Sequence, residues 1–260
     1  MAAPSVPTAV GQAPEFVPSE LARRDADRMA AYRRNLDFYR GLQWENSTRH
    51  RQLVFNYARV ALDKVTSYLV AGLSTACYPA DPSRETDVDL TERIDRAEAL
   101  LQYVLEDNGL DALDYETELD CAVLGDACYK VTWDPDAERI RITAPPVTGI
   151  YAWWRGDDPS RVWRVASRYR LPQAELAYLY GIAIQNREAW LTELWTASEF
   201  ALYLDDSLVE RKPNPYGVVP FIIFPNVREP KRFWGTSDVP SLVEPQRELN
   251  RAVSQLSRIL

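Results

Sequence analysis

One segment near the end of the chain reads Pro213-Asn214-Pro215-Tyr216-Gly217-Val218-Val219-Pro220, and the apolar run Phe221-Ile222-Ile223-Phe224 follows it directly. Gly235-Thr236-Ser237-Asp238 comes next, and a helical pattern then continues to Leu260. A helix commonly ends on Gly or Asn, with Pro soon after, and no such signal ends this pattern. We therefore expect either that a partner completes this helix or that the sequence is the front part of a longer protein.

The bulk properties of the 260 residues limit what the protein is. With 46% hydrophobic and 26% charged residues, the chain is typical of a soluble globular protein of one or two domains. No apolar run approaches the roughly 20 residues of a membrane helix, and the first residues lack the pattern of a signal peptide, so we expect no membrane partner. The three cysteines, Cys77, Cys121 and Cys128, are sparse and odd in number, which favours a reducing compartment.

The net charge of −8 is distributed unevenly. Between Asp81 and Asp120 there are 14 acidic and three basic residues, a balance of −11, which leaves about +3 for the rest of the chain. Proteins that grip DNA tightly carry a basic stripe. The sequence therefore predicts that this protein holds nucleic acid loosely or not at all.

Helical periodicity dominates the first half of the chain. Residues 1–18 show no period, and we expect a flexible arm there. A helical part is expected at 19–125, with helices near 19–41, 53–71, 89–108 and 110–124, the last ending at Gly125. The positions expected to face the core are Tyr57, Val60, Ala61, Tyr68 and Leu69 in the second helix, and Leu90, Ile94, Ala97, Leu101 and Val104 in the third.

The period changes from 3.6 to 2 after Gly125, which indicates strands in the part at 126–236. A hairpin turns at Asp134-Pro135-Asp136. Further strands are expected at 161–170, 190–196, 199–204 and 208–211, with a short helix at 172–180. Together with a last helix at 237–260, this order predicts an α+β fold: N-terminal helices, an antiparallel β meander and a C-terminal helix.

The residues that common catalytic sites need are missing from the sequence. The sequence has a single histidine, His50, and no Gly-x-Ser-x-Gly motif, so a Ser-His-Asp site is not expected. It also has no Gly-rich loop before a Lys that could bind phosphate. The acidic pairs Asp157-Asp158 and Asp205-Asp206 are typical of solvated turns. We therefore expect no enzyme, no catalytic residue, no metal site and no cofactor.

The tryptophans of the strand region suggest an alternative function. Trp153, Trp154, Trp163, Trp190 and Trp195 lie in the strand region, where they could form a stacking platform for sugars. The other interpretation is that they fill the core of a sheet or a contact between subunits, where Trp buries much area at small entropic cost. A carbohydrate-binding or carbohydrate-active domain is therefore the main alternative.

The order of several short motifs resembles the portal proteins of long-tailed bacteriophages. The resemblance covers roughly residues 20–260. Its motifs are Tyr39-Arg40-Gly41-Leu42-Gln43, Asn56-Tyr57, Tyr68-Leu69-Val70-Ala71-Gly72, Gly125-Asp126-Ala127-Cys128-Tyr129-Lys130-Val131, Asn214–Pro220, Gly235–Asp238 and a helix with Asn250 and Ser254.

The resemblance implies a virion structural protein. Portal proteins form rings, usually of twelve subunits, at one capsid vertex; DNA is pumped in through the ring and leaves through it towards the tail. The implied partners are other copies of the chain, the terminase motor, the major capsid protein, head–tail adaptor proteins and double-stranded DNA that passes non-specifically. Assembly would take place in the cytoplasm of the bacterial host. Another minor head or adaptor protein of a virion is a second alternative.

The resemblance also suggests roles for the last helix. Portal proteins continue past this point, so we expect the chain to hold the outer wing and the start of a stem helix at 237–260. The residues expected to pack against a neighbouring subunit are Leu249, Val253, Leu256 and Leu260. Those expected to face another subunit or the channel are Gln246, Asn250 and Arg251.

Overall fold

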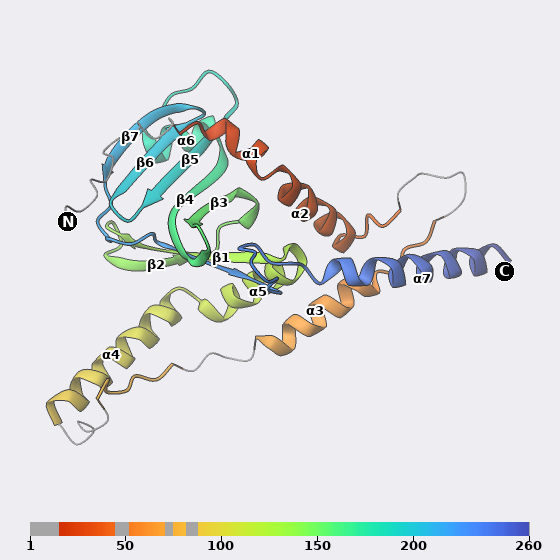
Figure 1. Ribbon diagram of the computed structural model, residues 1–260, viewed down its shortest axis with the longest axis horizontal. Helices are drawn as coiled ribbons and strands as arrows, with labels where there is room; N and C mark the ends of the chain where they lie inside the picture. The colour runs from red at the N-terminus through yellow and green to blue at the C-terminus, as the bar shows by residue number, and fades with distance from the viewer. Residues whose placement is uncertain (1–15, 45–51, 71–74, 82–87, 260) are drawn as a thin grey trace, which may run out of the picture.

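The computed structural model describes residues 16–44, 52–70, 75–81 and 88–259. It has an α+β fold, as the sequence predicts. Figure 1 shows a body of antiparallel strands, from which helices α4 and α7 extend in opposite directions. Of the expected flexible arm, residues 1–15 lie outside the described residues, whereas Phe16 packs edge-on against Trp153 and Tyr203.

The larger sheet is a five-stranded antiparallel meander, in which each strand pairs with the next one in sequence. Its core side includes Val165 and Leu191, which are fully buried. The sheet confirms the predicted meander. Its first strand, β3, was not predicted. The strands are β3 Ile150–Arg155, β4 Asp158–Pro172, β5 Glu188–Thr196, β6 Glu199–Leu204 and β7 Ser207–Pro213.

A second, three-stranded sheet has the order β2-β1-β8. Strands β1 (Asp126–Asp134) and β2 (Arg139–Thr143) form the predicted hairpin. Strand β8 (Phe221–Pro225) is the apolar run that follows the meander, yet it pairs antiparallel with β1. This pairing returns the chain to the start of the strand region, next to the end of the preceding helix.

The helices gather around α5, which contacts α2, α3, α7 and β1. Its last turns are buried because they lie among these neighbours. It ends at Gly125, as predicted, with a φ of +109°. The remaining helical elements are η1 Pro18–Glu20, α1 Leu21–Arg24, α2 Ala26–Tyr39, α3 Tyr57–Leu69, α4 Val88–Asp107, η3 Val147–Gly149, α6 Gln173–Tyr180 and α7 Val239–Ile259.

Two of the predicted helix faces are wrong. In α3 the buried residues are Ala58, Leu62 and Thr66, which lie four residues apart and face the neighbouring helices. The five positions expected to be buried in this helix are all exposed. Helix α4 has no buried residue; of its expected inner face only three residues are even half-buried, because the helix projects away from the body (Figure 1).

Candidate functional site at the base of the C-terminal helix

Helix α7 begins at a turn that is bonded to the end of α5. The Ser237 hydroxyl lies 3.0 Å from the carbonyl oxygen of Ala122 and 2.7 Å from that of Val123, and it accepts a hydrogen bond of 2.9 Å from the amide of Val239. The amide of Asp238 also donates to the carbonyl of Ala122, at 3.0 Å. The turn therefore satisfies groups at the C-terminus of one helix and at the N-terminus of another.

Glycine at two positions allows this close approach. A methyl group on Gly125 would lie 2.8 Å from the backbone nitrogen of Ser237, and one on Gly235 would lie 2.6 Å from the carbonyl oxygen of Gly125. Both distances are shorter than a Cβ atom tolerates. The turn before α7 can therefore pack on the end of α5 only because neither residue carries a side chain.

The buried carboxylate of Asp126 binds the turn that precedes α7. Asp126 accepts hydrogen bonds from the amide of Gly235, at 2.8 Å, and from the hydroxyl of Tyr32, at 2.6 Å. Burial raises the pKa of Asp126 to about 6, against the lowering effect of these bonds and of the nearby Arg28. The Arg28 guanidinium donates to the Tyr32 hydroxyl at 3.2 Å and lies 3.7 Å from the ring centroid of Trp234.

The middle of α7 is fixed by a second set of bonds, which run from its polar side chains to residues 53–58. Gln246 accepts from the amide of Ala58 at 2.9 Å and donates to the carbonyl of Phe55 at 2.7 Å. Asn250 accepts from the amide of Phe55 at 3.1 Å. Ser254, one turn further, accepts from the amide of Leu53 at 3.0 Å. These three side chains supply the hydrogen bonds that a neighbouring strand would otherwise give to the backbone of the segment before α3.

This geometry corrects the expectation for two residues of the last helix. Gln246 and Asn250 are buried within the chain, and Asn250 also donates to Gln43 at 2.7 Å. They therefore face neither a channel nor another subunit. Arg251 is exposed, but its guanidinium pairs with Glu248 on the same helix.

The predicted apolar stripe of α7 adjoins the face that carries these polar residues. Leu249 and Val253 are half-buried, whereas Leu256 keeps 57% of its surface exposed. Ile259, which the sequence reasoning left out, is also exposed. Leu260 lies outside the described residues. The apolar edge of α7 is therefore only partly covered by its own chain.

Sequence reasoning missed the inward role of Ser254 and of the segment before α3. The signal was present: Gln246, Asn250 and Ser254 recur every four residues and so share one helix face. Polar residues at this spacing are typical of a solvated face, and only the contact with 53–58 shows that the face is buried.

Each strand-region tryptophan contacts an arginine or an aromatic ring, although Trp163 keeps 42% of its surface exposed. The guanidiniums of Arg24 and Arg164 both contact the ring of Trp153, at 4.2 and 4.0 Å from its centroid. Trp154 stacks on Phe233 at 4.4 Å. The other contacts are those of Trp163 with Arg164, Trp190 with Arg168 and Arg170, and Trp195 with Phe200.

The described residues include neither a candidate metal site nor a membrane-spanning helix. No group of three or more His, Cys, Asp or Glu among them could hold a metal ion. None of the helices they form has the length and apolar character to cross a membrane.

No protein-family model matches the chain, and no curated protein matches it significantly.

Proposed function

We propose that this chain is a virion structural protein of the portal kind: the wing and the start of the stem helix of a ring through which double-stranded DNA passes. The proposal keeps the partners that the motif order implies, namely further copies of the chain, a packaging motor, the capsid shell and tail adaptors. It includes no catalytic role.

One observation carries the proposal. Helix α7 is fixed to its own chain by Ser237 at its base and by Asn250 along its polar face, yet Leu256 on its apolar stripe is exposed. A helix held this firmly cannot turn its apolar residues inwards. A second protein surface would cover them, and a ring of identical subunits supplies such a surface to every copy.

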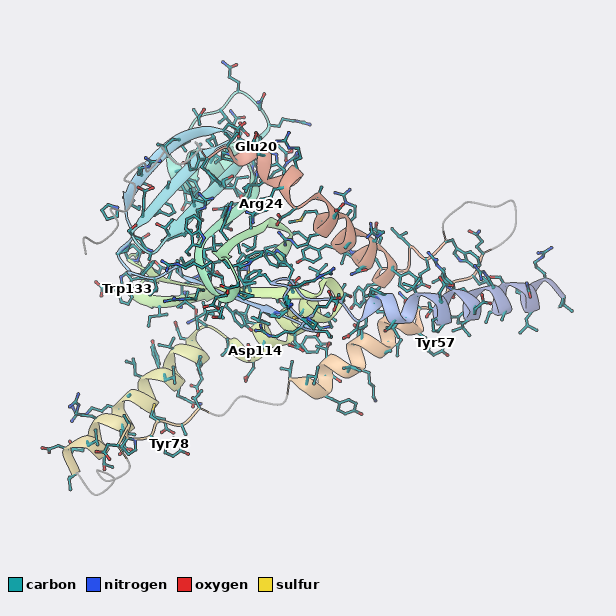
Figure 2. The ribbon with its side chains drawn as sticks, viewed as in Figure 1. Glu20, Arg24, Tyr57, Tyr78, Asp114 and Trp133 are labelled. Atoms are coloured by element: carbon teal, nitrogen blue, oxygen red, sulfur yellow. The ribbon has the colours of Figure 1, made fainter. Side chains whose placement is uncertain are left out.

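Helix α3 adds support, because its outer face is also apolar. Tyr57, Val60 and Tyr68 are exposed on this face, and Figure 2 shows Tyr57 at the start of α3, near α7. Exposed apolar side chains in a group favour an interaction surface over a free monomer.

The charges of α7 suit a channel that does not hold DNA. Arg247 pairs with Glu244 at 3.2 Å, and Arg251 pairs with Glu248. Each phosphate contact that releases counterions adds affinity for DNA. Arginines already paired with carboxylates on their own helix make such contacts less favourable, so a duplex would slide past without sticking.

The carbohydrate alternative is less well supported. A sugar platform needs open tryptophan faces, and Trp153, Trp154 and Trp190 already contact arginine or phenylalanine, which leaves Trp163 as the most open of these rings. These contacts fit the other interpretation, in which the tryptophans stabilise the sheets.

Mass photometry and negative-stain microscopy of the purified chain test the proposal. We expect particles with a central hole whose mass is a multiple of that of one chain. Leu256→Asp should abolish these particles without changing the unfolding of the monomer, since Leu256 is exposed there. Gln255→Asp, at an exposed position on the same helix, is the matched control and should assemble normally.

A wild-type chain that stays monomeric over the whole concentration range would overturn the proposal. Particles without a tunnel would favour the other virion alternative, a minor head or adaptor protein. Normal rings from Leu256→Asp would show that the α7 stripe does not pack between subunits.

A further inference from the structure

A groove opens between α2, the loop before α7 and the first turns of α7. Its volume is about 1080 Å³, above the roughly 300–1,000 Å³ of most small-molecule sites. Aromatic residues form much of its wall: Phe38, Trp44, Trp154, Phe233 and Trp234. A groove of this size and lining suits a segment of polypeptide better than a small molecule.

The groove is basic, although the protein as a whole is acidic. Five cationic side chains line it, against one acidic side chain, Asp37. The cationic residues are Arg28, Arg34, Lys231, Arg232 and Arg247.

Two of these cations are available to a partner. Arg232 already pairs with Glu229 at 2.7 Å. The side chains of Arg34 and Lys231 make no hydrogen bond or ion pair with any residue that the structure describes. An anionic segment that enters the groove would therefore meet unpaired positive charge beside aromatic surface.

A segment with the opposite properties lies elsewhere in the same chain. Helix α4 and residues 75–81 beside it form a projecting arm, and α4 carries six acidic and two basic side chains. Asp89 and Asp95 are exposed there, with no partner among the described residues. Tyr78, which Figure 2 shows beside α4, is 82% exposed, and Leu100 is also exposed.

The arm does not reach the groove of its own chain. Figure 1 shows α4 projecting from the body in the direction away from α2 and α7. A contact between arm and groove must therefore join two copies. It would use two different patches of the same chain, which is the head-to-tail geometry that generates rings.

We propose that the groove receives the α4 arm of a neighbouring copy, and that this contact joins adjacent subunits; the inference rests on the proposed ring. Acidic side chains of the arm meet Arg34 and Lys231, while its exposed tyrosine and leucine pack on the aromatic wall. Two copies that each carry a charge of −8 repel each other, and pairing an acidic arm with a basic groove offsets this repulsion locally.

Single and combined charge reversals in the full chain test the contact. We expect Arg34→Glu and Asp95→Lys each to raise the concentration at half-assembly by about tenfold or more. The combined variant should recover much of the wild-type assembly, because it restores opposite charges across the contact. All three monomers should unfold like the wild type, since both positions are exposed.

The matched controls are Arg187→Glu and Asp136→Lys, which make the same charge changes at exposed positions in other loops. They should assemble like the wild type. The contact is wrong if Arg34→Glu and Asp95→Lys behave like these controls, or if the combined variant is no better than either alone. If the wild type still forms rings in that case, the proposed function stands; a wild type that never assembles overturns both.

Discussion

Tyr32 donates a hydrogen bond of 2.6 Å to Asp126, although the two residues are 94 positions apart in the sequence. The other oxygen of the same carboxylate accepts from the amide of Gly235 at 2.8 Å. One buried side chain thus connects α2, the first strand and the turn from which α7 begins. This carboxylate is therefore one of the groups that fix where α7 begins.

Tyr32→Phe should lower the free energy of unfolding by roughly 1–3 kcal/mol. The substitution removes a donor from a buried carboxylate oxygen and puts nothing in its place. Urea unfolding measures the loss. Tyr178→Phe is the control, because Tyr178 is 89% exposed and bonds to no described residue, and it should change the free energy by less than about 0.5 kcal/mol. Equal losses in the two variants would contradict the role of the Tyr32 bond.

The same carboxylate predicts a pH dependence. Burial raises the pKa of Asp126 from 3.8 to about 6, so between these values the folded chain keeps a proton that the unfolded chain releases. The stability that this proton provides is complete below about pH 4 and is lost as the pH rises through 6. Asp126→Asn cannot titrate and should lack this loss, which we expect to be on the order of 1–3 kcal/mol.

Unfolding measured at intervals between pH 4 and pH 7 tests this expectation. The difference in free energy of unfolding between wild type and Asp126→Asn should change across the interval, in the direction that disfavours the wild type at the higher pH. Parallel profiles would show that Asp126 has the same pKa in the folded and unfolded chains.

Gly125→Ala should destabilise the chain by roughly 3 kcal/mol or more. Part of the cost is the left-handed backbone, and the rest is the contact of the new methyl group with the nitrogen of Ser237. Gly109→Ala is the control, because Gly109 has a φ of +60°, inside the left-handed region that L residues can enter, and nothing lies within 4 Å of the added group. Thermal or urea unfolding should give the larger loss at Gly125. Similar losses would mean that the turn before α7 relaxes freely.

The sequence predicted the elements that local signals define. Gly125 marked the end of α5, and the alternation around Asp134 marked the hairpin, because capping and strand period depend on neighbouring residues. The pairing of β8 with β1 could not be predicted this way. The apolar run Phe221-Ile222-Ile223-Phe224 indicates a buried strand but carries no information on which distant strand it joins.

The helix faces show a different limit of sequence patterns. Helix α3 has apolar residues on two faces, and the pattern does not tell whether Leu62 or Tyr68 faces the core of the chain. In α7 the polar residues Gln246 and Asn250 suggested a surface, whereas they bind backbone groups of a segment almost 200 positions away. A hydrophobic pattern tells only which residues are polar or apolar. It cannot show that a buried polar side chain hydrogen-bonds backbone groups that have no neighbouring strand to pair with.

The bonds of Asn250 lead to a prediction with a local measurement. Asn250→Ala removes the acceptor of the Phe55 amide and the partner of Gln43, and both groups lie in partly or fully buried positions. We expect a loss of roughly 2–4 kcal/mol. Hydrogen exchange should become faster at the amide of Phe55, while the amide of Ala58, which bonds to Gln246, stays protected for longer. Gln255→Ala, at an exposed position on the same helix, should change neither quantity. If exchange at Phe55 stays slow in Asn250→Ala, the segment before α3 is held by contacts other than the polar face of α7, and this face does not fix the direction of the helix.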